Sequence, residues 1–237
     1  MRGEKHAVIT GTGRAGTTFL VELLTRLGLE TGFSVDDMES KKSEVARAGL
    51  EYDIRKDDSP YIIKDPAFCS YVDEILCRDD IVIEHVFIPI RDLYEAAESR
   101  RYVENARISK WPLKKRLKNK IKIKLNLNLP VIAGGLWDTN SNKSGDQEDI
   151  LLRKIYRLVL ALSEKKVPIT FIRYPNLVKD STYLFEKLEP ILHDITYESF
   201  SSAFYKTVRP ELVHSFRKQN SDSVFRSSEW YSFRDTY

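Results

Sequence analysis

Two kinds of apolar pattern alternate along this chain. Short apolar runs have the length and composition of buried β-strands, and between them lie segments whose apolar residues recur at helical spacing. The strand-like runs are residues 6–10, 61–64, 81–90 and 167–174. The helix-like segments are residues 17–27, 68–77, 93–106 and 150–165. Because parallel strands need crossover connections, which helices supply, this order predicts a three-layer α/β/α sandwich with a mostly parallel central sheet.

A glycine-rich loop, GTGRAGTT at residues 11–18, joins the first strand to the first helix. It fits the phosphate-loop template GxxxxGK[ST], except that Thr17 stands where the template has lysine. The glycines let backbone N–H groups turn toward an oxyanion, and the helix that begins there adds the positive end of its dipole. The loop predicts phosphate binding in a P-loop NTPase-like fold. The alternative is a turn that only permits tight packing of strand and helix.

The missing lysine argues against hydrolysis of a nucleoside triphosphate. In P-loop enzymes that lysine reaches the β- and γ-phosphates, and an aspartate after an apolar strand manages Mg²⁺. We recognise neither feature in this sequence. ATP hydrolysis is therefore disfavoured.

Three further segments follow the loop. The first, IIKDPAFCSYVDEIL, places Lys64 two residues before a proline. The second, HVFIPIRDLYEAAESR, delivers Arg91 at the end of a strand and Ser99 eight residues later on a helix. An arginine can donate two hydrogen bonds to one phosphate, so this pair suits an anionic ligand. The third segment is FIRYPNLVKD.

Together with the loop sequence GRAGTTFL, these segments resemble the sulfotransferases that use 3′-phosphoadenosine 5′-phosphosulfate (PAPS). The resemblance spans residues 7–180 in the family's order, and it departs from the family at Leu93, usually proline, and Pro175, often glutamate. It implies an enzyme that transfers the sulfuryl group of PAPS to a hydroxyl or amine, releasing 3′-phosphoadenosine 5′-phosphate (PAP). No metal is required, because a sulfuryl group carries less charge than a phosphoryl group.

The resemblance also implies the site residues. The donor would be bound by Gly13, Arg14, Ala15, Gly16, Thr17, Thr18, Arg91 and Ser99. Arg14 would also stabilise charge on the leaving phosphate, and Lys64 would orient or polarise the acceptor. The general base would be Asp36 or Asp37, which follow the first helix, or alternatively Asp65.

Composition narrows the remaining possibilities. The 237 residues, 42% of them hydrophobic, suffice for one sizeable core, which predicts a single domain over residues 1–237. A net charge of +3 is too small to indicate nucleic-acid binding. The first residues lack a secretory signal and no apolar stretch has transmembrane length, so we expect a cytoplasmic protein without membrane spans.

The only strong charge run lies at residues 107–124, which hold nine basic residues and no acidic one. It is either a solvated helix face or a guide for an anionic ligand. Residues 107–149 as a whole are predicted to form an insert or lid near the acceptor site. The expected acceptor is a small molecule or a carbohydrate, with an anionic one among the options.

Two other functions stay open. A nucleotide kinase or NTPase with a degenerate P-loop predicts Mg²⁺-dependent ATP binding. A non-catalytic nucleotide-binding protein predicts that the donor binds without transfer.

Overall fold

A computed structural model of the chain describes residues 3–42, 48–124 and 144–213. Within these ranges one sheet has the strand order β2-β1-β3-β4, and every pair of neighbouring strands is parallel. The strands are β1 (Glu4–Ile9), β2 (Ile62–Lys64), β3 (Ile81–Ile90) and β4 (Ile169–Arg173). The predicted α/β class with a parallel sheet is confirmed.

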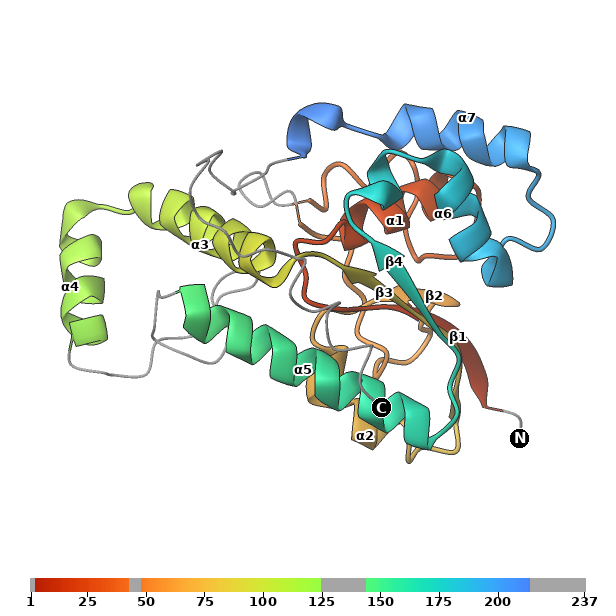
Figure 1. Ribbon diagram of the computed structural model, residues 1–237, viewed down its shortest axis with the longest axis horizontal. Helices are drawn as coiled ribbons and strands as arrows, with labels where there is room; N and C mark the ends of the chain where they lie inside the picture. Colours follow the sequence, from red (N-terminus) through yellow and green to blue (C-terminus); the bar gives the residue numbers. More distant parts are fainter. Residues whose placement is uncertain (1–2, 43–47, 125–143, 214–237) are drawn as a thin grey trace, which may run out of the picture.

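Helices cover both faces of this sheet (Figure 1). On one face lie α1 (Thr17–Arg26), α6 (Ser181–Leu188) and α7 (Tyr197–Thr207). On the other lie α2 (Val72–Ile75) and α5 (Ser144–Glu164). From the carboxyl end of β3, α3 (Leu93–Ser109) leads away to α4 (Leu113–Lys124). The arrangement is compatible with the predicted three layers.

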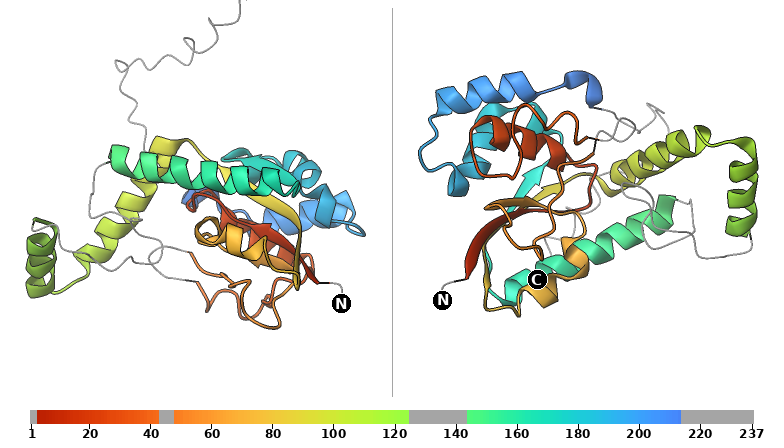
Figure 2. Two further views of the ribbon diagram at one scale, coloured as in Figure 1. Left: turned by 90° about the horizontal axis from the view of Figure 1, so that it is seen from below. Right: turned by 180° about the vertical axis from the view of Figure 1, so that it is seen from behind.

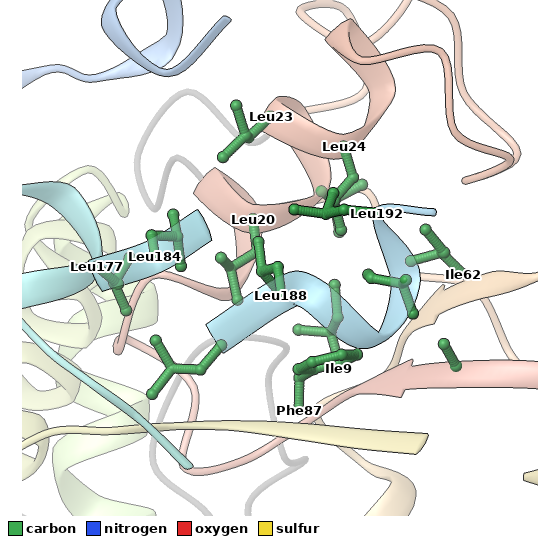
Figure 3. Close-up of a cluster of buried hydrophobic side chains, with 14 of the residues drawn as sticks. Ile9, Leu20, Leu23, Leu24, Ile62, Phe87, Leu177, Leu184, Leu188 and Leu192 are labelled. Carbon is green, nitrogen blue, oxygen red and sulfur yellow. The ribbon is translucent and has the colours of Figure 1, made fainter. Parts of the chain in front are cut away.

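The apolar stripe predicted for the first helix forms the centre of one core cluster. Leu20, Leu23 and Leu24 are fully buried and pack in a cluster with Ile9 and Phe87 of the sheet (Figure 3). This burial is what orients α1, and with it the loop that precedes α1, on the sheet. Each buried leucine contributes about 1.5–3 kcal/mol relative to an exposed one.

Two predicted helices depart furthest from their predicted bounds, while α3 runs three residues longer than expected, to Ser109. Residues 68–77 form a short 3₁₀ turn (Phe68–Ser70) and the single turn of α2, because Tyr71 leaves the helical region at φ −137°. The last long helix begins at Ser144 rather than at 150. Its first turn is polar and shows no apolar period, but Asp146 there favours the positive end of the helix dipole. Of the predicted lid, residues 125–143 lie outside the described part of the chain.

Strand β3 contains a register shift of one residue against β1. His6 pairs with Ile83, whereas Ala7 pairs with His85, so Glu84 is passed over. Ahead of the shift Ile83 faces the α5 side of the sheet; after it Phe87 faces the α1 side. The shift therefore changes which residues of β3 face which layer.

Among the described residues, no helix combines the length and the apolar character needed to cross a bilayer.

Candidate anion-binding site

The glycine loop, residues 11–18, follows β1 at the carboxyl edge of the sheet. The strand order reverses beside β1, since β2 lies on one side of it and β3 on the other. Parallel α/β sheets bind ligands in the crevice at such a point, because the loops there diverge to opposite faces. The loop and the carboxyl ends of its neighbouring strands thus form the first place to look for a site.

Left-handed backbone conformations shape the glycine loop. Gly13 (φ 63°), Arg14 (φ 58°) and Gly16 (φ 91°) all have positive φ. A non-glycine residue rarely adopts this conformation, so Arg14 holds an energetically costly position of the kind found at ligand-binding loops. Gly16 is also the N-cap of α1 and has no side-chain hydrogen bond to the first turn, which suits an anion at that helix end.

Two of the loop glycines are required by close neighbours. A Cβ on Gly16 would lie 2.8 Å from Cδ1 of Leu177, a fully buried residue of the segment FIRYPNLVKD. A Cβ on Gly13 would lie 3.1 Å from Nη2 of Arg100. The loop is thus held from one side by the segment after β4 and from the other by α3.

Arg14 and Ser99, predicted from motifs far apart in the sequence, meet at this loop. Nε of Arg14 donates to Oγ of Ser99 over 3.2 Å, and Ser99 is buried. Burial and the nearby charge of Arg91 lower the pKa of Arg14, and Tyr174 opposes them. Because the positive charge of Arg14 is buried beside another positive charge, a bound anion would stabilise it more than it would stabilise an exposed guanidinium.

Arg91 lies against the same loop. Its Nη1 donates to the carbonyl oxygen of Arg14 at 3.2 Å, and its Nη2 pairs with Glu95 at 2.9 Å. Its guanidinium also lies over the ring of Tyr174, 4.7 Å from the centroid. A pairing of Arg91 with a carboxylate one helical turn away is a feature that the sequence analysis did not foresee.

A third arginine, missed by the sequence analysis, contacts the loop. Arg100 is 1% exposed, and its Nη2 donates to the carbonyl oxygen of Thr12. Burial, together with the positive charge of Arg14, lowers the pKa of Arg100 to about 9. The sequence could have pointed to Arg100 only because it follows Ser99. Residues 98–101 do not indicate which of the two arginines, Arg100 or Arg101, is buried against the loop.

Lys64 approaches the loop from β2. Its Nζ lies 2.8 Å from Oγ1 of Thr18, and it also donates to the carbonyl oxygen of Gly49. Nζ forms an ion pair with Glu51 at 2.9 Å. Burial lowers the pKa of Lys64, while Glu51 works against this shift. An ammonium group thus stands beside the loop even though the loop itself has Thr17 in the lysine position.

Asp65, the next residue, is also buried. Its Oδ1 accepts from the backbone N–H of Ala67 at 2.7 Å, and its Oδ2 accepts from the hydroxyl of Tyr71. Burial raises the pKa of Asp65 to about 6, against the opposing effect of the hydrogen bond from Ala67. A carboxyl group with such a pKa titrates close to neutral pH and is suited to accept a proton.

Asp36 and Asp37 lie on the surface. Asp36 is exposed, and Asp37 accepts from the backbone N–H of Ser34 at 2.9 Å and from Lys41 at 2.6 Å. The hydrogen bond from Lys41 lowers the pKa of Asp37, which makes it a weaker base. Within the described ranges, no hydrogen bond or ion pair joins either aspartate to the glycine loop.

We compared the chain with protein-family models, curated proteins and solved structures. None of the three comparisons gave a match.

The charges around the loop define what this site can bind. Three guanidinium groups and one ammonium group contact the loop or each other there: Arg14, Arg91, Arg100 and Lys64. Among the described ion pairs, Glu95 pairs with Arg91 and Glu51 pairs with Lys64. These four cationic groups lie in a largely buried place, where an anion is attracted more strongly than at an exposed surface. Phosphate, sulfate and carboxylate groups fit this chemistry.

Proposed function

We propose that the protein is a PAPS-dependent sulfotransferase with a P-loop-like donor site. The observation that carries the proposal is the hydrogen bond between Arg14 and Ser99. It joins the loop expected to hold the 5′-phosphosulfate to the helix expected to help bind the 3′-phosphate, across 85 residues of sequence. Arg91, the other expected 3′-phosphate ligand, contacts the same loop.

The segment FIRYPNLVKD supports the same proposal, because two of its motif residues contact the loop or Arg91. Tyr174 lies against Arg91, and Leu177 packs against Gly16. Asp180 caps α6 by accepting from the N–H of Tyr183 at 2.9 Å. Tyr174, Leu177 and Asp180 of the motif thus have contacts in this chain that do not depend on the resemblance.

In the proposed reaction, the bond between sulfur and the bridging oxygen of the donor breaks, and its electron pair stays on the 5′-phosphate of PAP. A new bond forms between sulfur and the acceptor oxygen or nitrogen, and the acceptor's proton passes to a base. Arg14, the loop N–H groups and the hydroxyls of Thr17 and Thr18 stabilise the negative charge of the leaving phosphate. Lys64, hydrogen-bonded to Thr18, brings an ammonium group to the same end of the donor.

Of the three candidate bases, Asp65 has the most suitable chemistry. A carboxylate whose pKa is about 6 still binds a proton well near neutral pH, whereas Asp37 is held ionised by Lys41. Asp65 also lies directly after Lys64, at the carboxyl end of β2. We assign it the role of general base.

Calorimetric titration with PAP, and separately with ATP and Mg²⁺, tests the donor site. We expect PAP to bind more tightly than ATP. The variant Arg91→Met/Glu95→Gln removes the guanidinium without leaving a buried carboxylate alone. It should weaken PAP binding about 10- to 150-fold, the equivalent of one or two charge-assisted hydrogen bonds.

The matched control is Arg101→Met/Glu98→Gln, which removes an arginine–glutamate pair from the same helix. It should leave PAP affinity unchanged. Preference for ATP with Mg²⁺, without an effect of the Arg91 variant, would contradict the proposal and favour a nucleotide kinase. Tight PAP binding without turnover of PAPS on any acceptor would instead indicate a binding protein.

A further inference from the structure

Helix α4 concentrates positive charge at one end of the molecule. The nine basic residues of segment 107–124 include seven on this helix, and no acidic residue lies in the segment. The 29 remaining Lys and Arg residues are outnumbered by 35 Asp and Glu, so the rest of the chain carries a net charge of −6. An anionic surface would therefore attract this end of the protein and repel the remainder.

The same helix exposes large apolar side chains. Leu113, Leu117 and Ile121 are 70%, 52% and 56% exposed. They follow one another at intervals of four residues, so they lie along one side of α4. Lys114, Lys115, Arg116 and Lys118 are exposed around them. A helix whose only role was to keep the protein soluble would have polar residues at these three positions, because exposed aliphatic side chains lower solubility.

Position separates α4 from the core and from the anion-binding site. All three views show it at the far end of α3, standing away from the sheet and from the layer of α1, α6 and α7 (Figures 1 and 2). Trp111, just before α4, holds the ammonium group of Lys115 4.4 Å from its ring centroid. Tryptophan beside lysine is a combination typical of segments at a membrane interface.

We infer that α4 docks the protein onto the surface of a bilayer that contains anionic lipids, with Leu113, Leu117 and Ile121 inserted between headgroups and the lysines paired with lipid phosphates. Its 12 residues span about 18 Å, too short to cross a hydrocarbon layer of about 30 Å, so the helix lies in the interface. The inference rests on α4 alone and does not depend on the proposed sulfotransferase activity.

Two observations favour a bilayer as the partner and α4 as the segment that binds it. A soluble polyanion would be bound by the lysines and would leave the aliphatic residues in water. Helix α5 also exposes aliphatic residues, Leu152 and Leu160 at 55% and 46%, but its sequence mixes acidic with basic residues. Only α4, within the described residues, combines exposed aliphatic side chains with an unbroken set of basic ones.

Co-sedimentation of the full chain with vesicles tests the inference. We expect binding to vesicles of phosphatidylcholine with about one third phosphatidylserine, and at least tenfold weaker binding to phosphatidylcholine alone. Lys114→Gln/Lys115→Gln/Lys118→Gln should weaken binding to the anionic vesicles at least tenfold, and so should Leu117→Gln/Ile121→Gln. Raising the salt concentration should weaken binding by the wild type as well.

Two control variants match these changes elsewhere on the surface. Leu152→Gln/Leu160→Gln replaces equally exposed aliphatic residues of α5, and Lys56→Gln/Lys165→Gln/Lys206→Gln removes the same charge from exposed lysines. Both should bind vesicles as the wild type does. Equal binding to neutral vesicles, or full binding by the Leu117/Ile121 variant, would overturn the inference. Binding to heparin without binding to vesicles would overturn it as well and would indicate a soluble polyanion.

Discussion

The contact between Gly16 and Leu177 gives a prediction with a worked magnitude. An alanine at Gly16 must adopt φ near 91°, which costs about 1–2 kcal/mol for a residue with a Cβ. Its Cβ would also lie 2.8 Å from Cδ1 of Leu177, and relieving such an overlap in a packed core costs about a further 1–3 kcal/mol. We therefore expect Gly16→Ala to lower the free energy of unfolding by about 2–5 kcal/mol, measured by urea denaturation.

Gly28 provides the matched control. It has φ 80°, and a Cβ there would meet no atom within 4 Å, so Gly28→Ala should cost only the backbone contribution of about 1–2 kcal/mol. In a Leu177→Ala background the steric part should vanish, and Gly16→Ala should then cost about as much as Gly28→Ala. PAP affinity should fall in Gly16→Ala, because the loop must move to relieve the overlap, and should stay unchanged in Gly28→Ala. Equal destabilisation by the two alanines in the wild-type background would refute the reasoning.

Two further predictions concern stability. Because the pKa of Asp65 rises from 3.8 to about 6 on folding, the folded protein binds its proton more tightly than the unfolded chain does, and the carboxyl's contribution to stability falls as pH rises from about 4 to about 6. Asp65→Asn should remove this loss, so its free energy of unfolding relative to the wild type should increase by up to about 3 kcal/mol between pH 4 and pH 7 in urea titrations. Parallel profiles for Asp65→Asn and wild type would show that folding does not perturb the carboxyl. Asp180→Ala should cost about 1 kcal/mol in thermal or urea unfolding, because it removes the N-cap of α6, while Glu186→Ala on the exposed side of the same helix should cost much less. A loss no greater than that of Glu186→Ala would mean that the cap hydrogen bond contributes nothing net.

The strand and helix order could be predicted from sequence because it depends on patterns a few residues long. Leu20, Leu23 and Leu24 repeat at helical spacing, and the structure buries all three. The start of α5 could not be predicted in this way, because residues 144–149 are polar and carry no apolar period. The limits of an element are set by caps and by distant packing, which local periodicity does not report.

In the candidate site, too, some residues could be predicted from local sequence patterns and others could not. Motif spacing brought Arg14, Arg91 and Ser99 to attention, and the structure places all three at the glycine loop. It did not reveal Arg100, because α3 carries arginines at both 100 and 101, and only their distance from the loop distinguishes the buried one from the one paired with Glu98. Nor did it reveal that Glu95 and Glu51 already pair with Arg91 and Lys64. Contacts of this kind depend on the three-dimensional positions of helices and strands.

The one-residue register shift in β3 has a consequence for how this chain can vary. Glu84 is the residue that β3 has in excess of β1, so deleting it would make the pairing regular and leave every residue from His85 to the end of β3 on its present face. Arg91 comes six residues after His85, about 20 Å along an extended strand, and its direction follows from that count. A deletion at Val86 would instead turn Phe87 toward α5 and Arg91 away from the glycine loop, although neither residue had changed. Evolution is therefore freer to remove the residue at position 84 than to remove one between His85 and Ile90.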